Sequence, residues 1–134
     1  MVPAGLEVLR GKKVMLVDDS EDVLRVFIPP LIVATEGRAL FLQPHGEDAR
    51  ALAGAITARA PDVVLMDGEL SGGLQGFEVV RELQAVRPQV RCIGFSSAEG
   101  LRETFLAAGA IGFVEKHAGD PWGSLREAAG MLSW

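Results

Sequence analysis

The chain has 134 residues, of which 49% are hydrophobic and 23% charged, and its net charge at pH 7 is −5. No apolar run approaches the ~18 residues that span a bilayer, the start lacks the basic and apolar segments of a signal peptide, and the acidic balance argues against direct binding of nucleic acid. We therefore expect one cytoplasmic domain over residues 1–134, with a short lead-in over residues 1–11 and no membrane segment.

Short apolar runs alternate with helical patterns along the rest of the chain. The apolar runs predict strands over residues 12–17, 39–42, 63–66, 90–95 and 111–115. Apolar residues at helical spacing predict helices after Ser20 and over residues 49–56, 77–86, 101–108 and 122–132. This (βα)5 alternation predicts an α/β fold with a doubly wound, parallel, five-stranded sheet, because right-handed crossovers leave few other ways to assemble it.

Two segments depart from the regular pattern. The lead-in is expected to form at most a frayed turn. Ser20 is a suitable N-cap for the first helix. Pro29 and Pro30 predict that this helix ends near Ile28 or kinks there, because a proline inside a helix costs about 3 kcal/mol.

Four of the predicted strands end in polar residues that carry chemistry. Asp18 and Asp19 follow the first strand, Asp67 the third, Ser96 the fourth and Lys116 the fifth. In a parallel sheet of order 2-1-3-4-5 these ends share one edge, and the first and third strands adjoin. Three carboxylates about 5 Å apart repel by roughly 3 kcal/mol per pair at an effective dielectric near 20, and a hard cation such as Mg²⁺ relieves that repulsion. The pattern predicts a Mg²⁺ site beside a carboxylate, that of Asp67, which can form an aspartyl phosphate.

Five segments, in this order, resemble one known family. They are Val17-Asp18-Asp19-Ser20, Val64-Leu65-Met66-Asp67, Phe95-Ser96, Ala107-Ala108-Gly109-Ala110 and Gly112-Phe113-Val114-Glu115-Lys116. Over essentially its whole length, the chain resembles the receiver domain of two-component response regulators. The resemblance implies a flavodoxin/CheY-like fold and phosphorylation of Asp67 by a sensor histidine kinase or a phosphotransfer protein. It also implies that the protein is no enzyme for an external substrate and catalyses only its own phosphorylation and dephosphorylation.

The resemblance also implies a ligand set. Asp19 and Asp67 would ligate Mg²⁺ directly, Asp18 would act chiefly through water, and the backbone carbonyl of Glu69 would complete the site. Lys116 would bind a phosphoryl oxygen.

A switch and an output are implied as well. Ser96 would move toward the phosphate, and Phe113 would turn inward at the family's switch position. The changed surface would lie on the last two helices and the strand between them, where a downstream effector protein would read it. Trp122 and Trp134 are both expected near this surface, and homodimerisation through the same helices is left open.

The sequence departs from the family pattern in three places. Leu70-Ser71 replaces the usual Met-Pro pair, and Gly72-Gly73 indicates an insertion of about one residue, so we expect a differently shaped or flexible loop there. His117 follows Lys116 where the family has a proline in a cis bond. The separation between Ser96 and Lys116 is about two residues short, which predicts a trimmed fourth helix.

Other interpretations of the same residues remain open. Asp67, or the pair Asp18-Asp19, could be aspartates that cap helices, and Ser97 competes with Ser96 for the switch role. At the level of function, the chain could be a degenerate receiver that acts as an interaction module without phosphorylation. A Mg²⁺-dependent phosphatase with an aspartate nucleophile is the remaining alternative, because residues 67–71 partly resemble the haloacid dehalogenase motif.

Overall fold

A computed structural model describes residues 2–134 and contains one parallel sheet of five strands in the order β2-β1-β3-β4-β5. The strands are β1 (Val14–Val17), β2 (Leu40–Leu42), β3 (Val63–Met66), β4 (Arg91–Ser96) and β5 (Gly112–Glu115). The helices are α1 (Glu21–Ala34), α2 (Ala49–Ala58), α3 (Gly76–Val86), α4 (Arg102–Ala108) and α5 (Pro121–Ala129), with short 3₁₀ turns η1 (Glu7–Leu9) and η2 (Ser71–Gly73). The predicted fold class, alternation and strand order are confirmed.

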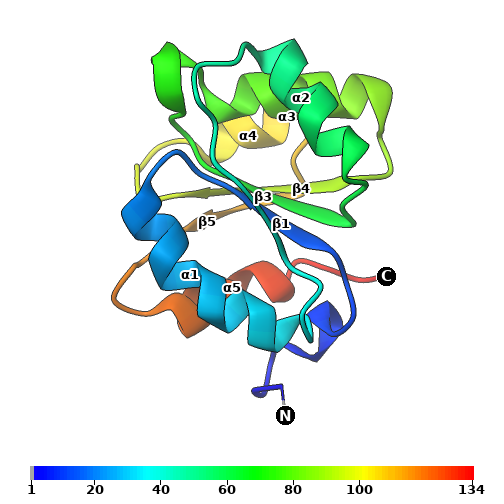
Figure 1. Cartoon of the computed structure of the whole chain (residues 1–134), viewed down its shortest axis with the longest axis vertical. Helices are drawn as coiled ribbons and strands as arrows, with labels where there is room; N and C mark the ends of the chain where they lie inside the picture. The colour runs from blue at the N-terminus through cyan, green and yellow to red at the C-terminus, as the bar shows by residue number, and fades with distance from the viewer. Residues whose placement is uncertain (1) are drawn as a thin grey trace.

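The sheet separates two layers of helices. Helices α1 and α5 cover one face, and α2, α3 and α4 cover the other (Figure 1). Strands β1 and β3 are buried at every position, as expected of central parallel strands that pack on both faces. Alternate residues therefore serve the two cores, with Leu16 and Leu65 facing α1 and α5 and with Met15 and Val64 facing the opposite layer.

The lead-in is packed, so the expectation of a frayed turn is wrong. Val2, Leu6 and Leu9 are buried in the core beneath α1 and α5. At the other end of the chain, the Trp134 indole N–H donates a hydrogen bond to the carbonyl of Val8 at 2.7 Å. Three apolar side chains in nine residues supply enough burial to order this segment against the core.

Helix α1 runs through both prolines and does not end near Ile28. Phe27, Leu31 and Ala34 on its inner face have no exposed surface. Ending the helix early would expose Leu31 and Ala34, and burial of one large apolar side chain contributes about 1.5–3 kcal/mol. The packing of α1 against the sheet therefore helps to offset the cost of its two internal prolines, about 3 kcal/mol each.

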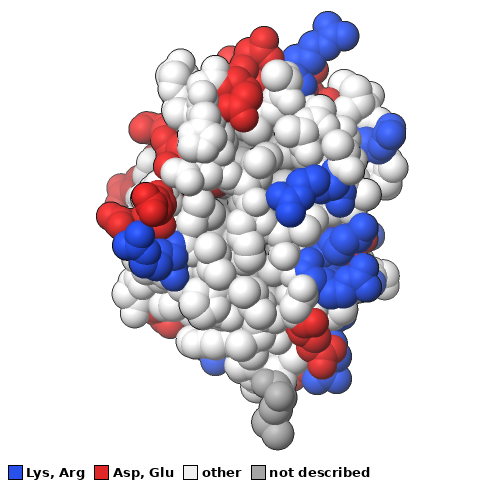
Figure 2. All heavy atoms as spheres, in the orientation of Figure 1, with Lys and Arg blue, Asp and Glu red and all other residues white. Residues whose placement is uncertain are grey.

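Charge is unevenly distributed between the two edges of the sheet, although the net charge is only −5 and each edge has exceptions, such as Asp62 at the amino edge and Lys116 at the carboxyl edge. Acidic residues follow the carboxyl ends of the strands: Asp18, Asp19, Glu47, Asp48, Asp67, Glu69, Glu99 and Asp120. Basic residues surround the amino ends: Lys12, Lys13, Arg38, Arg59, Arg87 and Arg91. Figure 2 shows most acidic side chains on the left and most basic ones on the right. This pattern complements the helices, which begin at the acidic edge and end at the basic one.

Within residues 2–134, no helix combines the length and the apolar character needed to cross a membrane.

Candidate functional site

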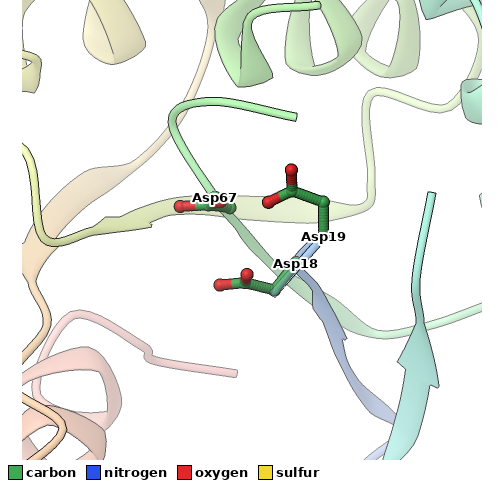
Figure 3. Close-up of side chains that lie close together, drawn as sticks. All are labelled: Asp18, Asp19 and Asp67. Carbon is green, nitrogen blue, oxygen red and sulfur yellow. The ribbon is translucent and has the colours of Figure 1, made fainter. Parts of the chain in front are cut away.

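The pairing of β1 with β3 brings three carboxylates together at the acidic edge. Val17 lies opposite Met66 in the register, and the Asp67 amide donates to the Val17 carbonyl at 3.0 Å. Carboxylate oxygens of Asp18, Asp19 and Asp67 all lie within 4.8 Å of one another. Figure 3 shows the three side chains at the adjoining ends of the two strands.

Lys116 bridges two of these carboxylates from the end of β5. Its ammonium donates to Asp18 Oδ2 and, at 3.1 Å, to Asp67 Oδ1. All three residues are buried, with Asp18 fully inaccessible. Buried charges are tolerated when they are paired and hydrogen-bonded. The ion pairs within this triad therefore make the burial of its three charged groups tolerable.

The surroundings of Asp67 change its acidity. The pKa of Asp67 is raised from the ordinary value of 3.8 to about 6, chiefly by burial; the Lys116 ammonium opposes this rise, the negative charge of Asp18 adds to it, and the Gly68 N–H opposes it. The Gly68 amide donates to Asp67 Oδ1 at 2.9 Å. Asp67 is therefore held in place and is largely ionised at neutral pH, the state in which a carboxylate is nucleophilic.

The aspartates are not the helix caps that one interpretation of the sequence suggested. Ser20 caps α1, because its hydroxyl accepts from the Val23 amide at 3.2 Å, and the N-cap of α3 is Gln75. Asp18 does accept a hydrogen bond from the Ser20 amide at 2.8 Å. That bond orients the Asp18 carboxylate while leaving its other oxygen to Lys116.

Ser96 lies at the wall of the site, and Ser97 does not. Ser96 is buried whereas Ser97 is exposed, and the Ser96 hydroxyl accepts from the Ala98 amide at 3.2 Å. Gly68 makes room for this arrangement, because a Cβ there would lie 2.8 Å from Ser96 Oγ and 2.5 Å from Leu101 Cδ1. The need for glycine directly after Asp67 was not anticipated from the sequence.

Phe113 is buried in β5 and packs on Phe105 of α4, with ring centroids 5.6 Å apart. Gly94 on β4 accommodates both rings, since a Cβ at Gly94 would lie 2.6 Å from Phe113 and 2.7 Å from Phe105. The guanidinium of Arg102 lies 5.9 Å from the Phe113 ring centroid. Phe113 thus connects the strand that carries Lys116 to α4, which is only seven residues long.

The loop after Asp67 is a small hairpin and not a flexible connector. Glu69 forms a bridge with Gln75, the Leu70 amide donates to the Leu74 carbonyl at 2.8 Å, and η2 forms the tip. Gly76 closes the hairpin beside the site, where a Cβ would lie 1.8 Å from the Asp67 carbonyl oxygen. Glu69 is exposed on the first arm, two residues beyond Asp67.

A parallel sheet of this order, with a lysine and an acidic cluster at its carboxyl edge, defines an α/β domain of the receiver class. The family model of the response regulator receiver domain matches residues 14–122, and the chain belongs to that family. It is thus a receiver domain of two-component signalling.

Solved structures share the fold. The receiver domain of DrrB, activated by BeF₃, has a TM-score of 0.71 and 21% identity, and the match covers 90% of this chain and 97% of that chain. The receiver domain of the histidine kinase CKI1 from Arabidopsis thaliana, complexed with Mg²⁺ and BeF₃⁻, has a TM-score of 0.66 and 25% identity, with 96% and 97% covered. The response regulator TrrA from Thermotoga maritima, in complex with Mg²⁺–BeF, has a TM-score of 0.69 and 18% identity, with 90% and 99% covered. A search of curated proteins finds no match.

Proposed function

We propose that Asp67 accepts a phosphoryl group from a histidine kinase or a phosphotransfer protein, in a Mg²⁺-dependent reaction that changes a protein-interaction surface. The observation that carries the proposal is the buried triad, in which Lys116 contacts both Asp67 and Asp18. A lysine at hydrogen-bond distance from the acceptor carboxylate is placed to hold an oxygen of a phosphoryl group on that carboxylate.

The donor set fits Mg²⁺. Asp18, Asp19 and Asp67 offer carboxylate oxygens within 4.8 Å of one another, and Mg²⁺ prefers oxygen ligands and binds through one or two carboxylates. The three carboxylates and the Lys116 ammonium leave an excess of two negative charges. By the family resemblance, Asp19 and Asp67 would hold the ion directly, Asp18 would act through water, and the Glu69 carbonyl would complete the set. When bound, the ion supplies positive charge that neutralises the phosphoryl oxygens.

The residues of the chain carry the transfer itself. A carboxylate oxygen of Asp67 attacks the phosphorus, the bond from phosphorus to the phosphohistidine nitrogen breaks, and the electron pair leaves with the imidazole. Lys116 holds a phosphoryl oxygen, and the Ser96 hydroxyl turns to donate to another. In the separate dephosphorylation step, water attacks the phosphorus, the bond from phosphorus to the Asp67 oxygen breaks, and inorganic phosphate leaves the free Asp67 carboxylate, so the chain acts only on its own phosphate.

The output follows from the contacts of Phe113. Phe113 is already buried in β5, so movement of Ser96 toward the phosphate would shift the packing of the Phe113 ring and would not bring it in from the surface. Because Phe113 contacts Phe105 and lies near Arg102, this movement changes the face formed by α4, β5 and α5. A downstream effector protein, or a second copy of the chain, would read that face.

Intact-mass measurement with acetyl phosphate and Mg²⁺ tests the proposal. We expect a gain of one phosphoryl group that is abolished by EDTA and by Asp67→Asn, and that persists in Asp22→Asn, an exposed α1 carboxylate. Many turnovers of a phosphomonoester per protein would instead identify a phosphatase. Absence of both modification and Mg²⁺ binding would identify an interaction module that works without phosphorylation.

A further inference from the structure

The peptide bond that follows Lys116 carries an N–H, because residue 117 is His117 and not proline. That N–H donates to the Ser124 hydroxyl at 2.9 Å. Ser124 belongs to α5 and is 5% exposed. A proline at 117 would have no hydrogen to donate, so the contact belongs to the residues of this chain.

The main chain around Lys116 is thereby held on both sides. The Lys116 amide donates to the Ser96 carbonyl at 3.0 Å, which ties it to β4. The next amide along the chain ties it to α5 through Ser124. Every peptide bond among residues 2–134 is trans. The direction of the chain at Lys116 is therefore set by these two hydrogen bonds and not by a cis peptide bond.

Ser124 is itself fixed. Its hydroxyl donates to the Asp120 carbonyl at 3.3 Å, and the Asp120 amide donates to the His117 carbonyl at 3.0 Å. The three contacts close a ring of hydrogen bonds from His117 through Asp120 to Ser124. A ring of this kind limits rotation of the peptide plane between Lys116 and His117, and that plane aims the Lys116 side chain.

We infer that Ser124 is a positioning residue. Through the His117 amide it holds the main chain at Lys116, and so places the ammonium that would contact the phosphoryl group. The inference rests on the proposed function. In the described part of the chain, Ser124 forms no hydrogen bond with the carboxylates of Asp18, Asp19 or Asp67. Its loss is therefore expected to weaken phosphoryl binding much more than metal binding, which it reaches only through the contacts of Lys116 with Asp18 and Asp67.

The test compares two affinities in the full chain. Mg²⁺ alone is titrated first, and beryllofluoride is then titrated in saturating Mg²⁺. In Ser124→Ala we expect the beryllofluoride affinity to fall about tenfold, because the part-buried His117 N–H loses its acceptor and no longer fixes the chain at Lys116, while the Mg²⁺ affinity stays within about twofold of the wild type. Ser124→Thr, which keeps the hydroxyl, restores beryllofluoride binding, and Ser133→Ala on the exposed tail changes neither affinity.

Other results overturn the inference. Unchanged beryllofluoride affinity in Ser124→Ala, or an equal fall in both affinities, excludes the positioning role. Should Ser124→Ala not fold, Ser124→Cys, which keeps nearly the same volume with a weak acceptor, must show the same selective loss. A wild-type chain that binds Mg²⁺ but no beryllofluoride, and gains no phosphate, contradicts the proposed function itself.

Discussion

Asp67 is a carboxylate that the fold keeps almost out of contact with water, and the Lys116 ammonium bridges it to a second carboxylate, that of Asp18. Burial raises the pKa of Asp67 to about 6. Since this value exceeds that of the unfolded chain, the folded protein binds the Asp67 proton more tightly than the unfolded protein does. The resulting contribution to stability is complete below about pH 4 and is lost as the pH rises through about 6. Ionised Asp67 therefore lowers stability at neutral pH, although the proposed phosphoryl transfer requires this ionised form.

This balance predicts that Asp67→Asn is more stable than the wild type in the absence of Mg²⁺. At pH 8 we expect the free energy of unfolding to rise by about 1–3 kcal/mol, because the amide removes a buried charge. The gain should shrink toward pH 4, where Asp67 is protonated. Urea unfolding at both pH values in EDTA measures the difference, with Asp22→Asn as the exposed control. A gain of equal size at the two pH values would contradict the assignment to Asp67.

Among the elements, α1 shows how tertiary packing overrides a local rule. Pro29 and Pro30 both remove hydrogen-bond donors from the helix interior, yet the helix continues for four residues beyond them. The two prolines differ in environment, since Pro29 is exposed and Pro30 is buried against the core. Only at Pro30, therefore, does burial of the ring offset part of the cost of the missing hydrogen bond.

We predict that Pro29→Ala stabilises the protein. Alanine restores an N–H to the helix and removes the clash with the preceding turn, while it adds disorder to the unfolded chain that costs about 0.4–1 kcal/mol. The expected net change is an increase of about 1–2 kcal/mol in the free energy of unfolding. Thermal and urea unfolding measure it, and Pro30→Ala, which also loses burial, should gain less. Destabilisation by Pro29→Ala would show that the ring is needed at this position.

The elements that the sequence predicted well are those whose signals are local. The apolar runs of the strands and the polar residues that end them are consecutive, so the sheet and the convergence of Asp18, Asp19 and Asp67 follow from pattern and topology. The hairpin after Asp67 was harder to predict from the sequence, because a Gly-Gly pair is compatible with either a flexible or an ordered loop. In the structure, Gly72 and Gly73 have positive φ values of 75° and 79°. The bond between His117 and Ser124 has no sequence signal at all, since an N–H donor is common to every residue but proline.

At the scale of the whole molecule, the C-terminal residue Trp134 lies at the basic edge of the sheet, beside the lead-in and away from the site. The Trp134 ring packs against Lys12 and Arg91, whose charged groups lie 4.6 and 4.8 Å from the ring centroid. Those two residues precede β1 and begin β4, so they mark the amino edge. The expectation that Trp134 lies near the output face is therefore wrong, whereas Trp122 lies in the first turn of α5, close to the chain that follows Lys116.

Two single-tryptophan variants test this arrangement. Trp134→Phe, which retains Trp122, should keep any fluorescence change caused by beryllofluoride with Mg²⁺, and Trp122→Phe should lose it. Trp134→Ala should also lower the free energy of unfolding by about 1–3 kcal/mol, because it removes the bond to Val8, the cation–π contacts and apolar area. A beryllofluoride response that persists in Trp122→Phe would show that the signal reaches the far edge of the sheet.

The uneven distribution of acidic and basic side chains between the two edges affects the order in which charged ligands reach the site. Opposite poles on one small body create a long-range field that draws cations to the acidic pole and repels anions from it. Acetyl phosphate and the phosphoryl group of a phosphohistidine are negatively charged, so the field disfavours their approach until an incoming cation has reduced the negative potential. This charge distribution thus favours binding of the cation before the phosphodonor. Added salt weakens that preference, because it screens the field over shorter distances.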